Sequence, residues 1–222
     1  TMAAAPAGAT SSQIWQQQCG VCHGGAGEGN RALDAPALTQ LSSDYLARQL
    51  THFVNGVRGA DPKDQAGHRM ALSVALLAPS DIPALAAFIS TDLPPARPEA
   101  TLKGEATRGK DYYTHLCSAC HGGNALGNPI LGAPSLAGAS DWYLKSAYQG
   151  FLDGLRGQHV DDVYGAQMAR LAPALSDEND RVIVIAHIRT MMPKWSLDSP
   201  VRPTFVPFPI SSHTVANRVP LS

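Results

Sequence analysis

The stretch Cys19-Gly20-Val21-Cys22-His23 decides how this sequence is interpreted, because the same pattern returns as Cys117-Ser118-Ala119-Cys120-His121. In each copy two cysteines stand three positions apart, and a histidine follows at once. The two copies use all four cysteines of the 222-residue chain. A pattern that occurs twice and leaves no cysteine over indicates one site in each half of the chain, built in the same way.

Cys-x-x-Cys-His is the attachment pattern of a covalently bound c-type haem. One helical turn places both thiols on the same side, where each can form a thioether with a vinyl group of the porphyrin. The histidine then directs an imidazole nitrogen at the iron. We therefore predict two covalently bound haem c groups. The residues expected to attach them and to bind their irons are Cys19, Cys22, His23, Cys117, Cys120 and His121.

Two other kinds of site use Cys-x-x-Cys pairs. Two pairs can build a four-cysteine zinc site, although the pairs of a structural zinc site usually stand closer in sequence than these do. A single pair can act as a redox dithiol, which is indicated most clearly inside a βαβ pattern. This sequence has no βαβ pattern, so haem attachment is the favoured interpretation.

The motifs belong to a longer internal repeat at an offset of 98 residues. Near the end of each copy a one-residue insertion shifts the match, so that Asp81 pairs with Asp180 and Ile89 with Ile188. A repeat of this length indicates a duplicated domain. Pairs at the offset of 98 include Leu33 and Leu131, Pro36 and Pro134, Tyr45 and Tyr143, Phe53 and Phe151, Arg58 and Arg156, and Met70 and Met168.

Each copy is expected to be mostly helical. Apolar residues at helical spacing predict one helix over residues 45–57 and another that begins at Asp81. The equivalent of the latter in the second copy is expected to be capped within residues 177–180. Ser11 or Ser12 is expected to cap the helix that leads into the first motif.

The chain is expected to divide into four segments: a first domain at 11–92, a proline-rich linker at 93–104, a second domain at 105–192 and a C-terminal tail at 193–222. Three prolines close together predict a stiff, extended linker. The tail is also rich in proline, with Phe205 among the prolines, and cannot be helical for long. We expect this tail either to wrap over its own domains or to dock to a partner protein.

Each half offers one methionine at the same distance from its histidine. Met70 stands 47 residues after His23, and Met168 stands 47 residues after His121. A thioether is a soft iron donor that raises the reduction potential, so these methionines are predicted as the second axial ligands. The alternative is that both are buried core residues, since methionine often fills gaps. Both are expected to lie in loops.

The other histidines and methionines do not repeat in this way. His68 and His159 lie close to the predicted methionine loops and are alternative ligands. Met191 and Met192 end an apolar helix face and are expected to be core residues. The histidines expected to be surface or packing residues are His52, His115, His187 and His213.

Further residues are expected around each haem. A ligating histidine usually donates its other ring N–H to a fixed acceptor. Pro36 and Pro134 each stand 13 residues after their histidine and are candidates to present a carbonyl oxygen. Arg58 and Arg156 are candidates to pair with haem propionates, the alternative being ordinary exposed helix ends.

Composition narrows the class of protein. The formal net charge is −1, which gives no reason to expect nucleic acid or an anionic membrane surface as a partner. No apolar run approaches the roughly 20 residues needed to cross a bilayer. The start at residues 1–6 lacks the features of a signal peptide and is expected to be a mature or trimmed terminus. Because bacteria attach c-type haem after export, we expect a periplasmic protein.

Each half resembles a class I c-type cytochrome: a helix that ends in Cys-x-x-Cys-His, a segment Ala35-Pro36-Ala37-Leu38 or Ala133-Pro134-Ser135-Leu136, a methionine segment and a C-terminal helix. The tandem arrangement is similar to the dihaem cytochromes c4, over roughly residues 11–192. This resemblance implies an all-α fold of two cytochrome c domains related by duplication. It also implies a carrier between a quinol-oxidising complex or dehydrogenase and a terminal oxidase or reductase.

Two other functions stay open. The tail, which cytochromes c4 usually lack, suggests a fixed electron-transfer subunit of a larger redox complex. A dihaem oxidoreductase with one labile distal ligand is the enzymatic alternative. A thiosulfate-oxidising enzyme with a cysteine iron ligand would need a fifth cysteine, which this chain lacks.

Overall fold

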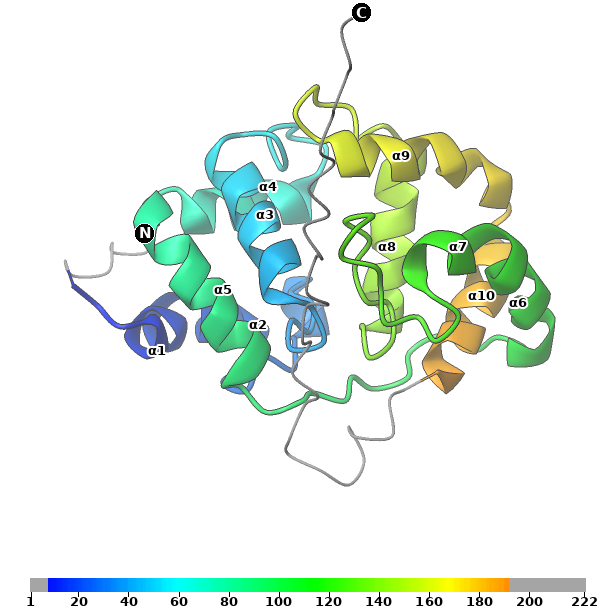
Figure 1. Ribbon diagram of the computed structural model, residues 1–222, viewed down its shortest axis with the longest axis horizontal. Helices are drawn as coiled ribbons and strands as arrows, with labels where there is room; N and C mark the ends of the chain where they lie inside the picture. The colour runs from blue at the N-terminus through cyan, green and yellow to red at the C-terminus, as the bar shows by residue number, and fades with distance from the viewer. Residues whose placement is uncertain (1–7, 192–222) are drawn as a thin grey trace, which may run out of the picture.

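The computed structural model describes residues 8–191 of the 222-residue chain. Within that range the chain folds into helices and loops without a β-strand, and two isolated bridges, Asn30–Ala35 and Asn128–Ala133, pair at the offset of 98. The predicted all-α class and internal duplication are confirmed. Figure 1 shows the two halves side by side, the first in blue to green and the second in green to orange.

The α-helices and the π-helical turn follow in the same order in each half, and the first half also contains the short 3₁₀ turn η2. The first half contains α1 (Ser11–Ile14), the π-helical turn η1 (Trp15–Cys19), α2 (Gly20–His23), η2 (Arg31–Leu33), α3 (Ser43–Val54), α4 (Gln65–Val74), η3 (Pro79–Asp81) and α5 (Ile82–Thr91). The second half contains α6 (Ala106–Tyr112), the π-helical turn η4 (Tyr113–Cys117), α7 (Ser118–His121), α8 (Asp141–Leu152), α9 (Val163–Leu171), η5 (Ala172–Leu175) and α10 (Glu178–Thr190).

The helix that leads into the first haem motif begins one residue earlier than predicted. Its N-cap is Thr10, not Ser11 or Ser12. The Thr10 hydroxyl accepts a hydrogen bond from the Gln13 N–H, and the Gln13 side chain accepts one from the Thr10 N–H, which makes a capping box. A threonine followed three residues later by glutamine was therefore the stronger signal.

A π-helical turn leads into each haem motif and ends at its first cysteine. The two turns, Trp15–Cys19 and Tyr113–Cys117, lie at equivalent positions of the repeat. Such turns are rare and cluster at functional sites. The first residue of each turn is almost fully buried, at 1% exposure for both Trp15 and Tyr113. Each donates a hydrogen bond into the glycine loop after the motif, to the carbonyl oxygens of Gly25 and Gly122 respectively.

The C-terminal helix of each half packs across the others and forms the core. In the first half α5 contacts α3 and α1, and in the second α10 contacts α6 and α8. Asp177 caps α10 by accepting from two backbone N–H groups, as predicted. Asp81 stands at the equivalent N-cap of α5, but its side chain makes no capping hydrogen bond. Helix α3 begins at Ser43 and ends at Val54, slightly before the predicted 45–57.

The prediction that Met70 and Met168 lie in loops is wrong. Met70 lies on α4 and Met168 on α9. Each helix is capped by an aspartate, and Gly67 and Gly165 in the first turns donate their N–H groups to Asp64 and Asp162, both at 2.9 Å. The glycines that suggested loops instead occupy the first turns of capped helices.

The segment between the halves is hydrogen-bonded to both of them. The Ala96 N–H donates to the Thr39 hydroxyl in the first half at 2.8 Å. The Thr101 and Leu102 N–H groups donate to Asp141 at the start of α8, at 2.8 and 2.9 Å. Figure 1 shows this segment running along one edge of both halves.

No single helix within residues 8–191 is long and apolar enough to cross a membrane; only the bent pair of α4 with residues 79–91 has that length and composition. Met192, His213 and the proline-rich tail, with Phe205, lie outside the described residues.

Candidate haem sites

Both motif histidines are held in one orientation by a backbone carbonyl. His23 Nδ1 lies 2.8 Å from the Pro36 carbonyl oxygen, and His121 Nδ1 lies 2.9 Å from that of Pro134. Burial lowers the pKa of both histidines, and the carbonyl hydrogen bond raises it only in part. Each imidazole is therefore neutral near pH 7, with Nδ1 protonated and Nε2 free to bind a metal.

The first cysteine of each motif has a raised pKa and does not readily form a thiolate. Burial, and secondarily the neighbouring Cys22, raises the pKa of Cys19 to about 12. The same two causes, with Cys120 as the neighbour, raise the pKa of Cys117 to about 11. A redox dithiol needs a lowered thiol pKa, so the dithiol interpretation loses support. A four-cysteine zinc site is not favoured either, since no three Cys, His, Asp or Glu side chains among the described residues are grouped to hold a metal.

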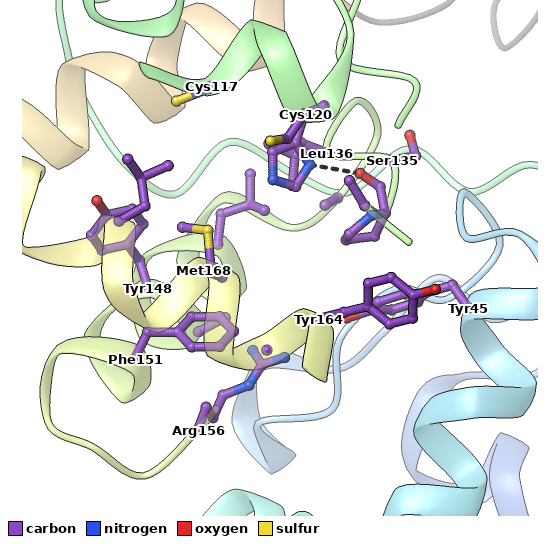
Figure 2. A pocket seen from close by; sticks show the side chains of 18 of the residues that line it. Tyr45, Cys117, Cys120, Ser135, Leu136, Tyr148, Phe151, Arg156, Tyr164 and Met168 are labelled. Carbon is purple, nitrogen blue, oxygen red and sulfur yellow. Dashed lines mark hydrogen bonds between the residues drawn. The ribbon is translucent and has the colours of Figure 1, made fainter. Parts of the chain in front are cut away.

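The second half contains a cavity between its motif and its methionine helix. Figure 2 shows Cys117 and Cys120 on one side and the Met168 thioether facing them from α9 on the other. Apolar side chains of Leu136 and Phe151 form part of the wall. Pro134, whose carbonyl accepts a hydrogen bond from His121, also lines this cavity.

The residues of this cavity fit a covalently attached haem. Two thiols from one helical turn, an oriented imidazole and a thioether provide the donor set of a His/Met haem iron. The apolar wall suits the macrocycle. His121, Met168, Cys117 and Cys120 would hold the group, because all four line the one cavity.

The first half places its residues at the equivalent positions. His23 is buried, at 6% exposure, and Met70 is half-buried against the first core. Cys19 also packs against that core. Since α4 corresponds to α9 in the repeat, Met70 has the same relation to its motif in sequence and in helix register as Met168 has.

The two arginines predicted near the haem propionates are half-buried instead of exposed. Arg58 and Arg156 lie over the rings of Phe53 and Phe151, with the guanidinium carbon 4.6 and 4.4 Å from the ring centroid. Arg58 also reaches into the other half, where its Nη2 donates to the Tyr143 hydroxyl at 3.3 Å.

Tyr143 is the residue on which the two arginines act together. Burial alone raises its pKa, but the positive charges of Arg58 and Arg156 outweigh burial and bring the pKa down to about 8. Because Arg58 comes from the first half and Arg156 from the second, the two halves share this hydroxyl. Tyr143 also lines the cavity of the second half.

Other contacts across the interface converge on the same cavity. Arg48 of α3 donates to the Gly132 carbonyl at 2.6 Å and lies over the Tyr164 ring, 4.6 Å from its centroid. His52 Nδ1 is 3.8 Å from Asp162, the residue that caps α9. Burial is the main cause that lowers the His52 pKa, against the attraction of Asp162.

The alternative histidine ligands have other contacts. His68 Nδ1 lies 3.2 Å from the Gly59 carbonyl oxygen. The His159 side chain is 42% exposed, and its Nδ1 lies 3.7 Å from Asp161. His52, expected at the surface or in packing, is a buried interface residue.

Sequence reasoning missed Arg48, His52, Asp162 and Arg181 as residues of this region. Of these, Arg48, Asp162 and Arg181 line the second cavity. Arg181 had a signal: it stands three, four and seven residues before Val184, Ile185 and Ile188, and so shares their buried face of α10. The interface residues gave no such signal, because their partners lie in the other half.

Comparison with known proteins agrees with the geometry. The Cytochrome c family matches residues 9–92 and again 106–192. A thiosulfate dehydrogenase electron acceptor of Thiomonas intermedia is 33% identical over 165 residues, which cover 69% of this chain and 71% of that protein. Cytochrome c4 of Stutzerimonas stutzeri is 28% identical over 187 residues, covering 80% and 87%.

A solved structure has the same fold. Cytochrome c4 of Acidithiobacillus ferrooxidans superimposes with a TM-score of 0.62 at 24% identity, covering 77% of this chain and 96% of that one. Two family matches, two motifs and two equivalent halves lead to the same conclusion. The chain belongs to the cytochrome c family and is a dihaem, cytochrome c4-like electron-transfer protein with two covalently bound haem c groups.

Proposed function

We propose that this chain is a periplasmic electron carrier that takes electrons from a dehydrogenase or a quinol-oxidising complex and passes them to a terminal oxidase or reductase. The relative from Thiomonas intermedia, by its name, accepts electrons from a thiosulfate dehydrogenase. That name supports a dehydrogenase as the donor. Each bound haem c supplies a one-electron iron couple, so the protein has to hold the iron and to exclude other chemistry from it.

In this proposal Met70 and Met168 would bind the two irons together with His23 and His121. The observation that carries it is the Met168 thioether facing Cys117 and Cys120 across one cavity (Figure 2), with Met70 at the equivalent position of the repeat. Two strong protein ligands leave an iron no position for a substrate. The proposed function is therefore electron transfer without a chemical reaction of a substrate at either iron.

The surrounding residues have supporting roles in the proposal. The Pro36 and Pro134 carbonyls keep Nδ1 of each ligating histidine protonated, so that Nε2 is the nitrogen available to the iron. Arg58 and Arg156 would pair with haem propionates. Support comes from the position of Arg156 in the cavity lining and from the half-buried positions of both arginines.

The test is the absorption spectrum of the dithionite-reduced holoprotein before and after carbon monoxide. We expect no change in the Soret band of the unmodified protein. In Met70→Ala and Met168→Ala we expect a carbon monoxide-dependent Soret shift from one haem each, because each variant opens one iron. A matched control is Met191→Ala, a half-buried methionine that packs against the second core and does not line the cavity.

The outcomes separate the candidate functions. A Soret shift in the unmodified protein would contradict the carrier proposal and favour a dihaem oxidoreductase with a labile methionine. Stopped-flow reduction by a purified thiosulfate dehydrogenase and by a quinol-oxidising complex then ranks the donors. Co-purification of the full chain with a partner at high salt would favour a fixed subunit over a free carrier.

A further inference from the structure

One buried charge distinguishes the second haem site from the first. Arg181 lies on α10 with 5% of its surface exposed, and it lines the same cavity as Cys117, His121 and Met168. After the one-residue insertion, its counterpart in the first half is Ile82 on α5, which is 3% exposed. The same position of the repeat is therefore cationic in one half and apolar in the other.

The Arg181 guanidinium is held by neutral acceptors. Nη1 donates to the carbonyl oxygens of Leu175 at 2.9 Å and Ser176 at 2.6 Å, and Nη2 donates to the Gln149 side-chain oxygen at 3.0 Å. Within residues 8–191 no carboxylate forms an ion pair with Arg181. Arginine stays protonated in proteins, so a full positive charge remains in the cavity wall.

The other charges of this cavity do not cancel that difference. Arg156 and Asp162 have counterparts of the same charge in the first half, Arg58 and Asp64. Arg48 also lines the second cavity and adds positive charge from across the interface. Of the cationic residues that line this cavity, Arg181 is the one that α10 places in the core.

We propose that Arg181 sets the reduction potential of the second haem above that of the first, and thereby directs electrons within the protein from the first haem to the second. Reduction adds one negative charge at the iron, and a fixed positive charge nearby stabilises the reduced state. Burial strengthens this effect because a low dielectric and the absence of salt weaken screening. The inference deepens the proposed carrier function and rests on it.

The test is a spectroelectrochemical titration of the holoprotein and of Arg181→Met, which removes the charge and keeps a long side chain. We expect the midpoint potential of the second haem to fall and that of the first to stay. The equilibrium constant for electron transfer between the haems should fall about tenfold, or about 59 mV for a one-electron couple. Met70→His assigns the steps, because it lowers the potential of the first haem alone.

Arg181→Lys is the matched control, because it keeps the charge and should keep most of the difference in potential. Unchanged potentials in Arg181→Met, or equal shifts in Arg181→Lys and Arg181→Met, would overturn the proposal. Carbon monoxide spectra and thermal unfolding of the same samples show whether Met168 still binds and the fold is intact. A spectrum insensitive to carbon monoxide with unchanged potentials would reject the role of Arg181 while leaving the carrier function in place.

Discussion

The two halves of this chain share the order of their α-helices and their haem motifs, but they differ at many buried side chains. Helix α8 repeats α3 at the offset of 98 residues, and the His–Pro hydrogen bonds are the same within 0.1 Å. Yet Ser43 at the start of α3 is replaced by Asp141 at the start of α8, and Ile82 by Arg181. Duplication has kept the groups that hold haem and has changed the groups that make each half distinct.

The largest effect is expected where a buried charge has no counterpart. Asp141, at 1% exposure, accepts hydrogen bonds from Thr101, Leu102 and Trp142 and lies 3.6 Å from Arg189. We expect Asp141→Ala to lower the free energy of unfolding by about 3–5 kcal/mol, because the partners of a buried charge are left unpaired. Urea unfolding of the holoprotein, followed by far-UV ellipticity, measures it.

Ser43→Ala at the equivalent position is the control. It lies at a half-buried helix start, and its effect is expected to stay within about 0.5 kcal/mol. Equal losses of unfolding free energy in the two variants would contradict the prediction. They would mean that the hydrogen bonds of Asp141 to the linker add no stability beyond that of an ordinary helix start.

Where the two backbones agree, equal effects are expected. Gly59 and Gly157 have φ of 77° and 74°, and a Cβ at either would overlap the carbonyl oxygen of Gly67 or Gly165 in the methionine helix. Each alanine substitution should cost about 1–3 kcal/mol from the left-handed conformation alone. Thermal unfolding compares the two variants. A difference of more than about 1 kcal/mol between them would show that the halves do not share this turn in solution.

A smaller effect is expected from pH, again in the second half. Burial alone would raise the pKa of Asp141, but hydrogen bonds from Thr101, Leu102 and Trp142 outweigh burial and lower it. The unfolded chain then binds the proton more readily, so stability from Asp141 is fully present above about pH 4 and is lost as the pH falls through the lowered folded pKa. Unfolding at pH 2–6 measures this loss.

Asp141→Asn separates this group from all other carboxylates. It lacks the titrating group, so the difference in stability between the unmodified protein and the variant should shrink toward acid pH. A difference that stays constant from pH 6 to pH 2 would show that the Asp141 pKa is not lowered in the folded protein.

The sequence alone predicted the helices because their signals are local. Leu46, Leu50 and Phe53 stand at helical spacing, and the structure buries all three on α3. Asp177 precedes an apolar face and caps α10. The prediction of loops around Met70 and Met168 was wrong. It took Gly67 and Gly165 as loop signals and did not consider the aspartate three residues before each glycine, which caps the helix.

The contacts between the halves could not be predicted in the same way. Arg58 reaches Tyr143, 85 residues further along the chain, and Arg48 reaches Gly132. Such pairs depend on how two finished domains dock, and no spacing within either copy encodes that. The burial of Arg181 could have been predicted from the sequence, because it is a charged residue on an otherwise apolar face of a helix.

The smallest effect is expected at an exposed difference beside the methionine helix. Arg69 Nη2 donates to Asp34 at 2.7 Å, and the two side chains are 53% and 59% exposed. The second half has Gln167 and Gly132 at these positions and cannot form the pair. We expect Arg69→Gln to change the free energy of unfolding by less than about 1 kcal/mol, because exposed ion pairs are screened by water.

Measuring the stability of the variants at several salt concentrations tests whether the effect comes from the charges of Arg69 and Asp34. Asp34→Asn removes the same pair, and asparagine tolerates the left-handed conformation at this residue, where φ is 51°. Both variants should approach the unmodified protein in stability as ionic strength rises to about 1 M, where the Debye length is about 3 Å. A loss above about 2 kcal/mol that persists at high salt would contradict this, and would indicate that Arg69 holds the first turns of α4 in place through the Leu33 carbonyl, to which it also donates at 3.3 Å.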